Sequence, residues 1–481
     1  MHGFHVALLA GAAWAVASTP SQGASALYNV GPTVQVSRGS AERVHDEVFL
    51  AAHPTDPKRL IGCVMVDLDR YAERLLHVIA YTTEDGGATW KAAAESSEFV
   101  GDPMCGYDPA GGAYLIGIGT DDESWKDSVW WMEILRSEDG GRAWGKGMRM
   151  PGGDRPYLAF DFSDGPTRGV GYVVYSIRAT ILDKKEPTRT LREAGAPTLE
   201  VRRTTDGGRT WEKTAVGVGT NLSAFPTATG AAVLSDGTFV TLWLERPMPP
   251  PDPPEGWTPE GRKALYAVTA GPGADMFRRG VKIADFEDDL GESGTFYTLA
   301  ADPGPGPTRD RLYAAWTDRR GGPRSRIMGS RSSDGGATWS APVAVNAEGL
   351  TDRSAARDDY APTLAVNRDG IVGIIWRRRS RVEEDAEVWF AASRDGGASW
   401  LPAARVSAPG AEVDGGVVMA KLRPSDDGVS PGSRPRKFFK GGDTAGLAAD
   451  ANGAFHALWS DQRSGIGQTY TATVRVAAPK P

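Results

Sequence analysis

The sequence is poor in cysteine and histidine and has no excess of positive charge, and each scarcity excludes a class of protein. Only two of the 481 residues are cysteines, Cys63 and Cys105, so disulfides are not the scaffold. One bridge and two buried free thiols both stay open. The formal net charge of −7 argues against a general nucleic-acid binder, which needs a basic field. The six histidines lack metal-ligand spacing, so we expect neither a metal nor a cofactor.

Long hydrophobic runs and common catalytic fingerprints are also absent. The apolar run at residues 6–17 is too short to span a membrane, and nothing later is longer. It precedes Ala24-Ser25-Ala26, which suits Ala-x-Ala cleavage, so we expect residues 1–26 to be a signal peptide of a secreted or periplasmic protein. A start codon assigned too early is the alternative, because the first residues lack Lys and Arg. No Walker loop, dinucleotide fingerprint or nucleophile elbow occurs.

What the chain does contain is glycine, proline and tryptophan, arranged in a repeat. The 60 Gly, 33 Pro and 15 Trp are typical of a β-rich protein with many turns. Five segments share the pattern Ser/Thr-x-Asp-Gly-Gly-x-x-Trp: residues 83–90, 137–144, 204–211, 332–339 and 393–400. Adjacent glycines permit a tight reversal, the Asp carboxylate can accept backbone N–H bonds, and the Trp covers the turn. We interpret the motif as a structural fastener of a hairpin without chemistry of its own.

The spacing of the motif predicts the architecture. Its aspartates are 54, 67, 128 and 61 residues apart, so one unit near residue 270 has lost its copy. A period near sixty is typical of a four-stranded propeller blade. Paired inner strands recur seven times, and the last unit has only three strands, so we expect residues 31–37 to supply its fourth. The prediction is an all-β, seven-bladed propeller over residues 27–481, with six blades as the alternative.

At these motifs the sequence resembles the Asp-box, or BNR-repeat, propellers, of which the sialidases are the best-known members. The resemblance covers nearly the whole chain after residue 26 and is specific for the fold rather than for activity. It implies six blades, an arginine triad that grips a sialate carboxylate, a Tyr–Glu nucleophile pair and an Asp acid/base. The first arginine of that triad is expected where this chain has His45, Asp46 and Glu47, so the sequence departs from the sialidase pattern there.

Acidic and basic residues are expected to meet at the channel mouth opposite the motif turns, because the segments before inner strands and after second strands share that face. Tyr360, Asp359 and Glu292 are the candidate catalytic residues, since glycoside cleavage needs paired carboxylates or a Tyr–Glu pair. The candidate substrate-binding residues are Arg155, Arg319, Arg377, Arg463, Asp154 and Asp443. Pairing of these Asp and Arg side chains across neighbouring blades is the structural alternative.

Two functions follow from this site, and a third is weaker. The first is an exported exo-glycosidase of sialidase type that acts on terminal anionic sugars of glycans. The second is a non-catalytic propeller that binds glycan or protein ligands at the channel mouth. The third is a polysaccharide lyase or another glycosidase. We expect a monomer whose partner is a carbohydrate or glycoconjugate. Long segments at residues 179–197, 247–263 and 424–440 are expected to shape the same face.

Overall fold

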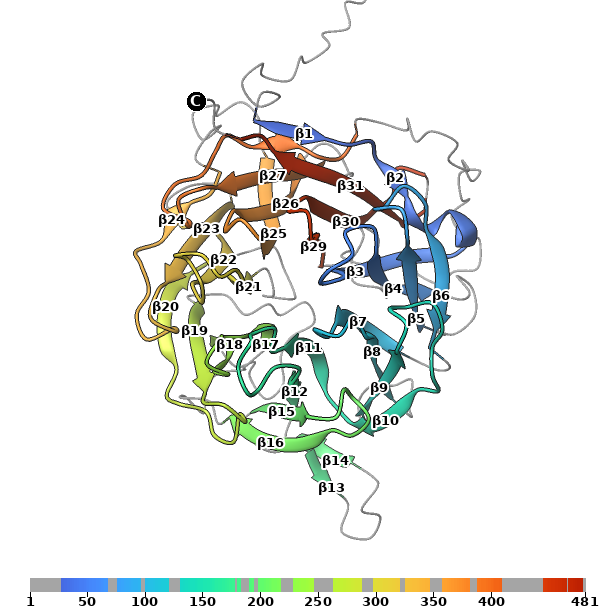
Figure 1. Cartoon of the computed structure of the whole chain (residues 1–481), viewed down its shortest axis with the longest axis vertical. Helices are drawn as coiled ribbons and strands as arrows, with labels where there is room; N and C mark the ends of the chain where they lie inside the picture. The colour runs from blue at the N-terminus through green and yellow to red at the C-terminus, as the bar shows by residue number, and fades with distance from the viewer. Residues whose placement is uncertain are drawn as a thin grey trace, which may run out of the picture.

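Seven β-sheets stand in a ring around a central channel in the computed structural model (Figure 1). The structure describes residues 27–67, 76–96, 100–120, 130–177, 180–182, 190–193, 198–217, 228–245, 263–287, 297–320, 325–346, 357–380, 387–408, 444–464 and 466–478. Within these ranges the one helix is the short 3-10 helix η1 (Val36–Ser40). No helix in the described part of the chain is long and apolar enough to cross a membrane.

Each sheet is an antiparallel blade, and in blades 1 to 6 the strands run outward from the channel in chain order, which confirms the predicted seven blades. Blade 1 is β3 (Val44–Ala52), β4 (Leu60–Asp67), β5 (Leu76–Thr83) and β6 (Lys91–Glu95). Blade 2 is β7 (Val100–Tyr107), β8 (Ala113–Thr120), β9 (Trp130–Ser137) and β10 (Met148–Pro151). Blade 3 is β11 (Asp154–Phe160), β12 (Gly171–Ile177), β15 (Thr198–Thr204) and β16 (Glu212–Gly217). A separate hairpin, β13 (Thr180–Leu182) with β14 (Thr190–Glu193), lies in the first predicted long segment.

The remaining blades repeat this plan. Blade 4 is β17 (Ala228–Val233), β18 (Phe239–Glu245), β19 (Lys263–Ala270) and β20 (Val281–Phe286). Blade 5 is β21 (Tyr297–Ala301), β22 (Leu312–Asp318), β23 (Arg326–Ser332) and β24 (Val343–Ala344). Blade 6 is β25 (Arg357–Val366), β26 (Val372–Ser380), β27 (Glu387–Ser393) and β28 (Ala404–Arg405). Blade 7 is β29 (Gly446–Ala449), β30 (Phe455–Asp461) and β31 (Gln468–Val476), joined by β1 (Tyr28–Val30) and β2 (Val34–Gln35).

The ring closes by pairing the two ends of the chain, as predicted. Both β1 and β2 pair antiparallel with β31, so the first segment completes the last blade and covers the edge of β31. The closing segment differs in detail from the predicted residues 31–37, because pairing begins at Tyr28 and Val36 already belongs to the 3-10 helix. Pro32 lies in the break between the two strands, where its missing N–H cannot weaken the ladder. The Tyr28 hydroxyl accepts a hydrogen bond from Ala392 N at 3.1 Å, which ties the closure to blade 6.

The core lies between neighbouring blades rather than in one centre. The second strands of blades 5, 6 and 7 each carry a fully buried tryptophan, namely Trp316, Trp376 and Trp459. Each packs into a cluster built from two adjacent sheets, for example Trp316 with residues of blades 4 and 5. Apolar burial on both faces therefore holds each blade to its neighbours.

Each repeated motif forms the turn between the third and fourth strands of its blade, as the sequence predicts. In the copy at 332–339, Asp334 accepts hydrogen bonds from Ser332 Oγ at 2.8 Å and from Thr338 N at 2.9 Å. Gly336 N donates to Ser332 Oγ at 2.9 Å, at a φ of +90°. Trp339 packs against the core cluster of blades 4 and 5. The motif thus closes its hairpin with internal contacts.

The fourth blade lacks the motif, and its turn is held differently. The chain leaves β19 and returns through an isolated bridge between Ala270 and Phe277 before β20 begins, close to the predicted residue 270. The Gly273 carbonyl accepts a hydrogen bond from the Arg203 guanidinium of blade 3 at 3.1 Å. A neighbouring blade therefore supplies contacts to this turn.

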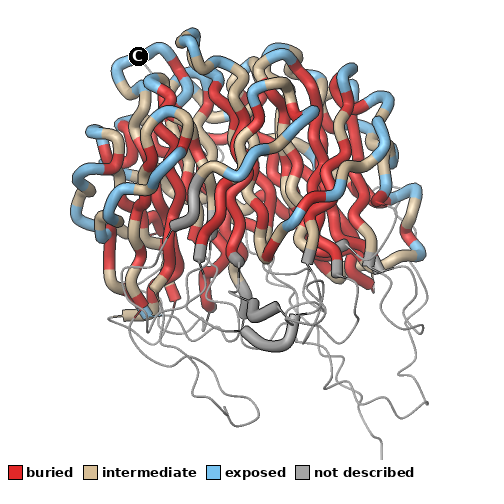
Figure 2. The backbone as a smooth tube through the Cα atoms, turned by 90° about the horizontal axis from the view of Figure 1, so that it is seen from below, coloured by how far each residue is buried: buried red, intermediate tan, exposed pale blue. Residues whose placement is uncertain are grey.

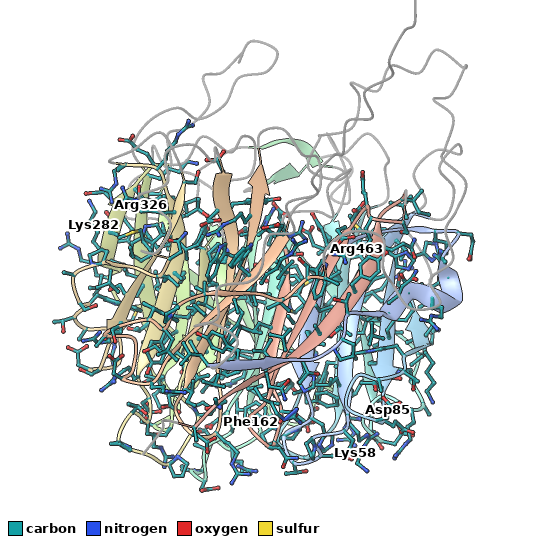
Figure 3. All side chains as sticks on the ribbon, turned by 90° about the horizontal axis from the view of Figure 1, so that it is seen from above. Lys58, Asp85, Phe162, Lys282, Arg326 and Arg463 are labelled. Carbon is teal, nitrogen blue, oxygen red and sulfur yellow. The ribbon has the colours of Figure 1, made fainter. Side chains whose placement is uncertain are left out.

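The two ends of the ring carry different structures. Figure 3 places Asp85, a motif residue, at one end, and Arg326 and Arg463 at the other. Exposed residues gather at the turns of one end, while the strands between the two ends are largely buried (Figure 2). We name the two ends the turn end, with the motif hairpins, and the loop end, where the inner strands begin. This separation agrees with the predicted placement of the motif away from the candidate site.

Candidate functional site

The inner strands of five blades bend near the loop end. Each has a register shift there, with one residue in the left-handed region: Glu47, Asp102, Arg155, Gly230 and Ala361. Their φ values run from +43° to +74°. A non-glycine residue in this conformation costs on the order of 1–3 kcal/mol, and such strain concentrates at functional sites. A bulge also redirects side chains, so these positions can present polar groups at the channel mouth.

Three of these bulges bring charged residues together from adjacent blades. Glu47 of β3, Asp102 of β7, and Asp154 and Arg155 of β11 form what we call the carboxyl cluster. Arg155 N donates to Asp102 Oδ2 at 3.2 Å. A small cavity of about 10 Å³, room for roughly one water, lies between Glu47, Asp102 and Arg155. Figure 1 shows β3, β7 and β11 side by side around the channel.

Asp102 holds its proton more tightly than an ordinary aspartic acid. Burial, together with the negative charge of Asp154 and the hydrogen bond with it, raises the pKa of Asp102 to about 7. Arg155 and a hydrogen bond with Glu47 act in the opposite direction and lower it. One carboxyl group of the cluster is therefore protonated for a substantial part of the time near neutral pH, beside partners that can carry the negative charge.

Aromatic and hydroxyl groups border the carboxyl cluster. The rings of Phe49 and Tyr157 meet edge to face, with centroids 5.8 Å apart. Thr444 of blade 7 accepts a hydrogen bond from Val48 N at 2.9 Å and also lines the small cavity. These contacts join blades 1, 3 and 7 at the channel mouth. A ligand there would meet aromatic faces as well as charge.

Two residues predicted from the sequence, Asp154 and Arg155, lie in this cluster, while Asp359 and Tyr360 lie in blade 6. The buried Asp359 carboxylate accepts two hydrogen bonds from the Arg378 guanidinium, at 2.6 and 2.8 Å, and a third from the Asn346 amide. Arg378 also stacks over Trp389 at 4.4 Å. Tyr360 is itself buried. Asp359 is thus paired with an arginine, as the structural alternative expected, but that arginine lies on its own blade and not on a neighbouring one.

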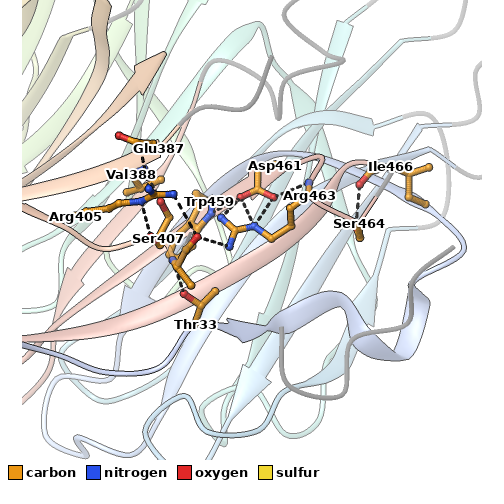
Figure 4. A network of polar contacts seen from close by, with 11 residues as sticks. Thr33, Glu387, Val388, Arg405, Ser407, Trp459, Asp461, Arg463, Ser464 and Ile466 are labelled. Atoms are coloured by element: carbon orange, nitrogen blue, oxygen red, sulfur yellow. Dashed lines mark hydrogen bonds and ion pairs between the residues drawn. The ribbon is translucent and has the colours of Figure 1, made fainter. Parts of the chain in front are cut away.

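The other predicted arginines lie in blades 5, 6 and 7, away from the three blades that form the carboxyl cluster. Arg377 is fully buried and donates to the carbonyl of Thr444 at 2.9 Å, which links blade 6 to the rim of the cluster. Arg319 follows β22, and its backbone N donates to the carbonyl of Glu287 at 2.7 Å. Arg463 donates two hydrogen bonds to the Asp461 carboxylate, from Nε at 2.9 Å and from Nη2 at 2.5 Å (Figure 4). Glu292 and Asp443 lie outside the described residues.

A tyrosine–glutamate contact does occur, but away from the carboxyl cluster. The Tyr175 hydroxyl on β12 bonds the Glu200 carboxylate on β15, and Arg202 donates to the same hydroxyl at 2.9 Å. Lys213 forms a further ion pair with Glu200. Tyr175 and Glu200 are buried in the second and third strands of blade 3, and burial and the carboxylate raise the pKa of Tyr175. The arrangement stabilises the blade.

The sequence contains one signal that selects Glu47 and Asp102, although neither was among the candidate catalytic or substrate-binding residues. Glu47, Asp102 and Arg155 follow one another at intervals of 55 and 53 residues, close to the interval of 54 between the motif residues Asp85 and Asp139. Equivalent positions in successive blades meet around the channel, so this common spacing places the three together. Among the described residues, no group of three or more His, Cys, Asp or Glu could hold a metal ion.

Comparisons with known proteins show neither a family nor an activity for this chain. No protein-family model matches the sequence, and no curated protein matches it. The structure is similar to a protein of unknown function from Dyadobacter fermentans, with 12% identity, a TM-score of 0.45, and 94% and 99% of the two chains covered. It is similar to the NanB sialidase of Streptococcus pneumoniae, with 9% identity, a TM-score of 0.47, and 74% and 68% covered. It is also similar to an α-L-arabinofuranosidase from Fusarium graminearum, with 13% identity, a TM-score of 0.44, and 76% of this chain and 98% of the other covered.

Proposed function

We propose that this protein is an exported, sialidase-like Asp-box propeller that hydrolyses terminal glycosidic bonds at the carboxyl cluster. The observation that carries the proposal is the raised pKa of Asp102, about 7, in a group with Glu47, Asp154 and Arg155. Glycoside hydrolysis requires one protonated carboxyl group and one carboxylate on either side of the scissile bond. The cluster supplies both near neutral pH.

Asp102 is the proposed general acid, and it protonates the leaving oxygen as the glycosidic C–O bond breaks. Asp154, whose negative charge raises the pKa of Asp102, is the proposed carboxylate: it either activates the water that attacks the sugar carbon or stabilises the positive charge that develops on it. Arg155 contributes positive charge that favours a sugar bearing a carboxylate, because a guanidinium can bind a carboxylate through two parallel bonds. The proposed substrate class is therefore a glycan with a terminal anionic sugar.

The test is turnover of a panel of fluorogenic glycosides, sialosides and uronides included, by the chain from residue 27 onward. Asp102→Asn should lower kcat by about 10²–10⁴-fold, the usual contribution of a general acid, without lowering the melting temperature. Asp164→Asn is the matched control, since it removes an exposed carboxylate from the turn-end loop of blade 3 and should leave kcat unchanged. Failure of the unmodified protein to turn over any glycoside would refute the proposal.

A non-catalytic propeller that binds glycan at the same mouth is the second candidate. It is favoured by the Asp–Arg pairs near the loop end, which satisfy one another: Asp318–Arg320, Asp359–Arg378 and Asp461–Arg463. Under this alternative, Arg155→Gln weakens the binding of an anionic glycan, Asp102→Asn has little effect, and no product forms. Calorimetric titration with a sialylated oligosaccharide, alongside the turnover assay, separates the two candidates.

Export and a monomeric state belong to the same proposal. The signal-peptide pattern at residues 1–26 supports export to the periplasm or the medium. Sequencing the N-terminus of the protein recovered from the expressing cells and from the medium tests this, and the expected first residue is Leu27. Light scattering during size-exclusion chromatography tests the monomer.

A further inference from the structure

The turn end of the channel contains a cavity that the proposed function does not use. Its volume is about 310 Å³, at the lower end of the range of about 300–1,000 Å³ for small-ligand pockets. Its walls come from the inner strands of the first five blades, at residues such as Ala52, Ala159, Ala232 and Ala301. These short side chains leave room for a ligand and make this part of the wall apolar, while Ser163, Ser235 and Asp302 add polar groups.

The mouth of this cavity carries two opposite charges next to each other. Arg309 Nε lies 4.0 Å from Asp310 Oδ2, and the two side chains are 40% and 34% exposed. Asp310 is held in place, since Oδ1 accepts from Ser235 N at 2.7 Å and Oδ2 accepts from the Ser235 hydroxyl. A guanidinium has five N–H donors, and each carboxylate oxygen accepts more than one bond, so both groups can also bind a ligand.

An exposed aromatic ring stands at the same mouth. Phe162 lines the cavity and is 41% exposed, one of two large hydrophobic side chains exposed among the described residues. Figure 3 places Phe162 at the turn end, together with Lys58 and Asp85. An exposed apolar ring beside the alanine-lined part of the wall favours a ligand with an apolar portion.

We propose that this cavity binds a free apolar α-amino acid. Such a molecule has a carboxylate and an ammonium group on one carbon, which matches the adjacent Arg309 and Asp310. Its side chain would enter the alanine-lined channel and pack against Phe162. A ligand with only one charge would leave one of the two protein groups unmatched. The site lies at the opposite end of the channel from Asp102 and does not depend on the proposed hydrolysis.

The experiment is calorimetric titration of the chain from residue 27 onward with L-phenylalanine and three analogues. N-acetyl-L-phenylalanine lacks the ammonium group, L-phenylalanine amide lacks the carboxylate, and glycine lacks the side chain. We expect saturable 1:1 binding of L-phenylalanine and at least about tenfold weaker binding of each analogue, since each loses one charge-assisted or apolar contact. Absence of saturable binding by L-phenylalanine and L-leucine overturns the proposal, and so does equal binding of the amide.

Variants locate the binding. Arg309→Gln should weaken the binding of L-phenylalanine by at least about tenfold. It should leave the binding of the amide unchanged, because the amide has no carboxylate for Arg309 to contact. Asp310→Asn keeps the turn, since Asn tolerates its φ of +62°, and should weaken the acetylated analogue least. Ala232→Leu should abolish binding by filling the cavity, with Ala301→Leu as its substitute if the first variant does not fold. Arg155→Gln, at the other end, is the control and should bind normally; unchanged binding by Arg309→Gln overturns the proposal.

Discussion

Aspartates at the two ends of the ring differ in how tightly they hold their protons. At the turn end, the motif aspartates accept hydrogen bonds from hydroxyl and backbone N–H groups, and these bonds hold the pKa of Asp206 and Asp395 down to about 2. At the loop end, burial and the charge of Asp154 raise the pKa of Asp102 to about 7. The residue type is the same, so the difference comes from what surrounds each carboxyl group: donors in one case, and another acid in the other.

The difference in pKa separates the structural role of the motif aspartates from the catalytic role proposed for Asp102. A carboxylate stabilised by its own hairpin releases its proton at low pH and is a poor general acid, whereas an acid that keeps its proton to neutral pH is suited to proton transfer. We therefore expect changes at the turn end to alter stability without altering turnover. Changes at the loop end should alter turnover, and in one case raise stability.

The largest expected effect is a loss of stability from an alanine at a motif glycine. Gly208 has a φ of +81°, and a Cβ there would lie 2.5 Å from Cε1 of the buried Tyr114 ring. Backbone strain and overpacking together should lower the free energy of unfolding of Gly208→Ala by about 3 kcal/mol or more. Gly336→Ala is the matched control, because its Cβ would meet nothing closer than 3.4 Å and it should lose only about 1 kcal/mol. Equal melting temperatures for the two variants would contradict the explanation.

The second effect is the pH dependence of stability near the carboxyl cluster. Burial lowers the pKa of His45 to about 4, and its Nε2 lies 2.8 Å from the Tyr81 hydroxyl. Below about pH 6.5 the unfolded chain binds a proton at His45, whereas the folded chain binds it only as the pH falls to about 4. The stability contributed by neutral His45 is thus present above pH 6.5 and is lost, by up to about 3 kcal/mol, as the pH falls to 4.

Asp102 has the opposite dependence. Its folded-state pKa of about 7 lies above the ordinary value of 3.8, so its contribution is present below about pH 4 and is lost as the pH rises to 7. Urea denaturation from pH 4 to 8 measures the free energy of unfolding at each pH. His45→Phe should lose the fall in this free energy toward acid pH, and Asp102→Asn should lose the fall toward pH 7. Parallel curves for both variants and the unmodified protein would contradict these assignments.

Much of the fold follows from the repeat, because the motif is a local structure and its interval counts the blades. The five motif copies locate the turns between the third and fourth strands, the double interval locates the unit without the motif, and the short last unit indicates the closing strand. The interruption of that strand at Pro32 and the 3-10 turn after it are local details that a strand prediction over residues 31–37 passes over.

The site was less predictable, because it depends on contacts between blades. The sequence indicated acids before the inner strands, and Asp154 and Arg155 do lie in the carboxyl cluster. It did not indicate that the inner strands bulge at Glu47 and Asp102, since neither residue type favours a positive φ as glycine does. Nor did it distinguish Asp102, which lies beside another acid, from Asp359, which pairs with Arg378 on its own sheet.

A smaller effect is an opposite change in stability from the same substitution at the two ends. Asp334→Asn weakens bonds to Ser332 and Thr338 and should lower the free energy of unfolding by about 1 kcal/mol. Asp102→Asn should raise it at pH 8 by on the order of 1 kcal/mol, because the unfavourable carboxylate beside Asp154 is removed. Chemical denaturation at pH 8 measures both. A loss of stability in both variants would mean that Asp102 is held by its partners as firmly as the motif aspartates are.

The smallest expected change concerns the two cysteines, which lie between the two ends. Cys63 of β4 and Cys105 of β7 are free and buried, and both thiols donate to the carbonyl of Phe49, at 3.8 and 3.5 Å. Burial raises the pKa of the Cys63 thiol, and the adjacent Cys105 raises it further, so little thiolate forms at neutral pH. A chromogenic disulfide reagent at pH 8 should therefore detect no thiol in the folded protein purified under reducing conditions and two per chain in denaturant. Rapid reaction of the folded protein would mean that blades 1 and 2 separate easily, and the carboxyl cluster, which spans the same two blades, would then be less rigid than its geometry indicates.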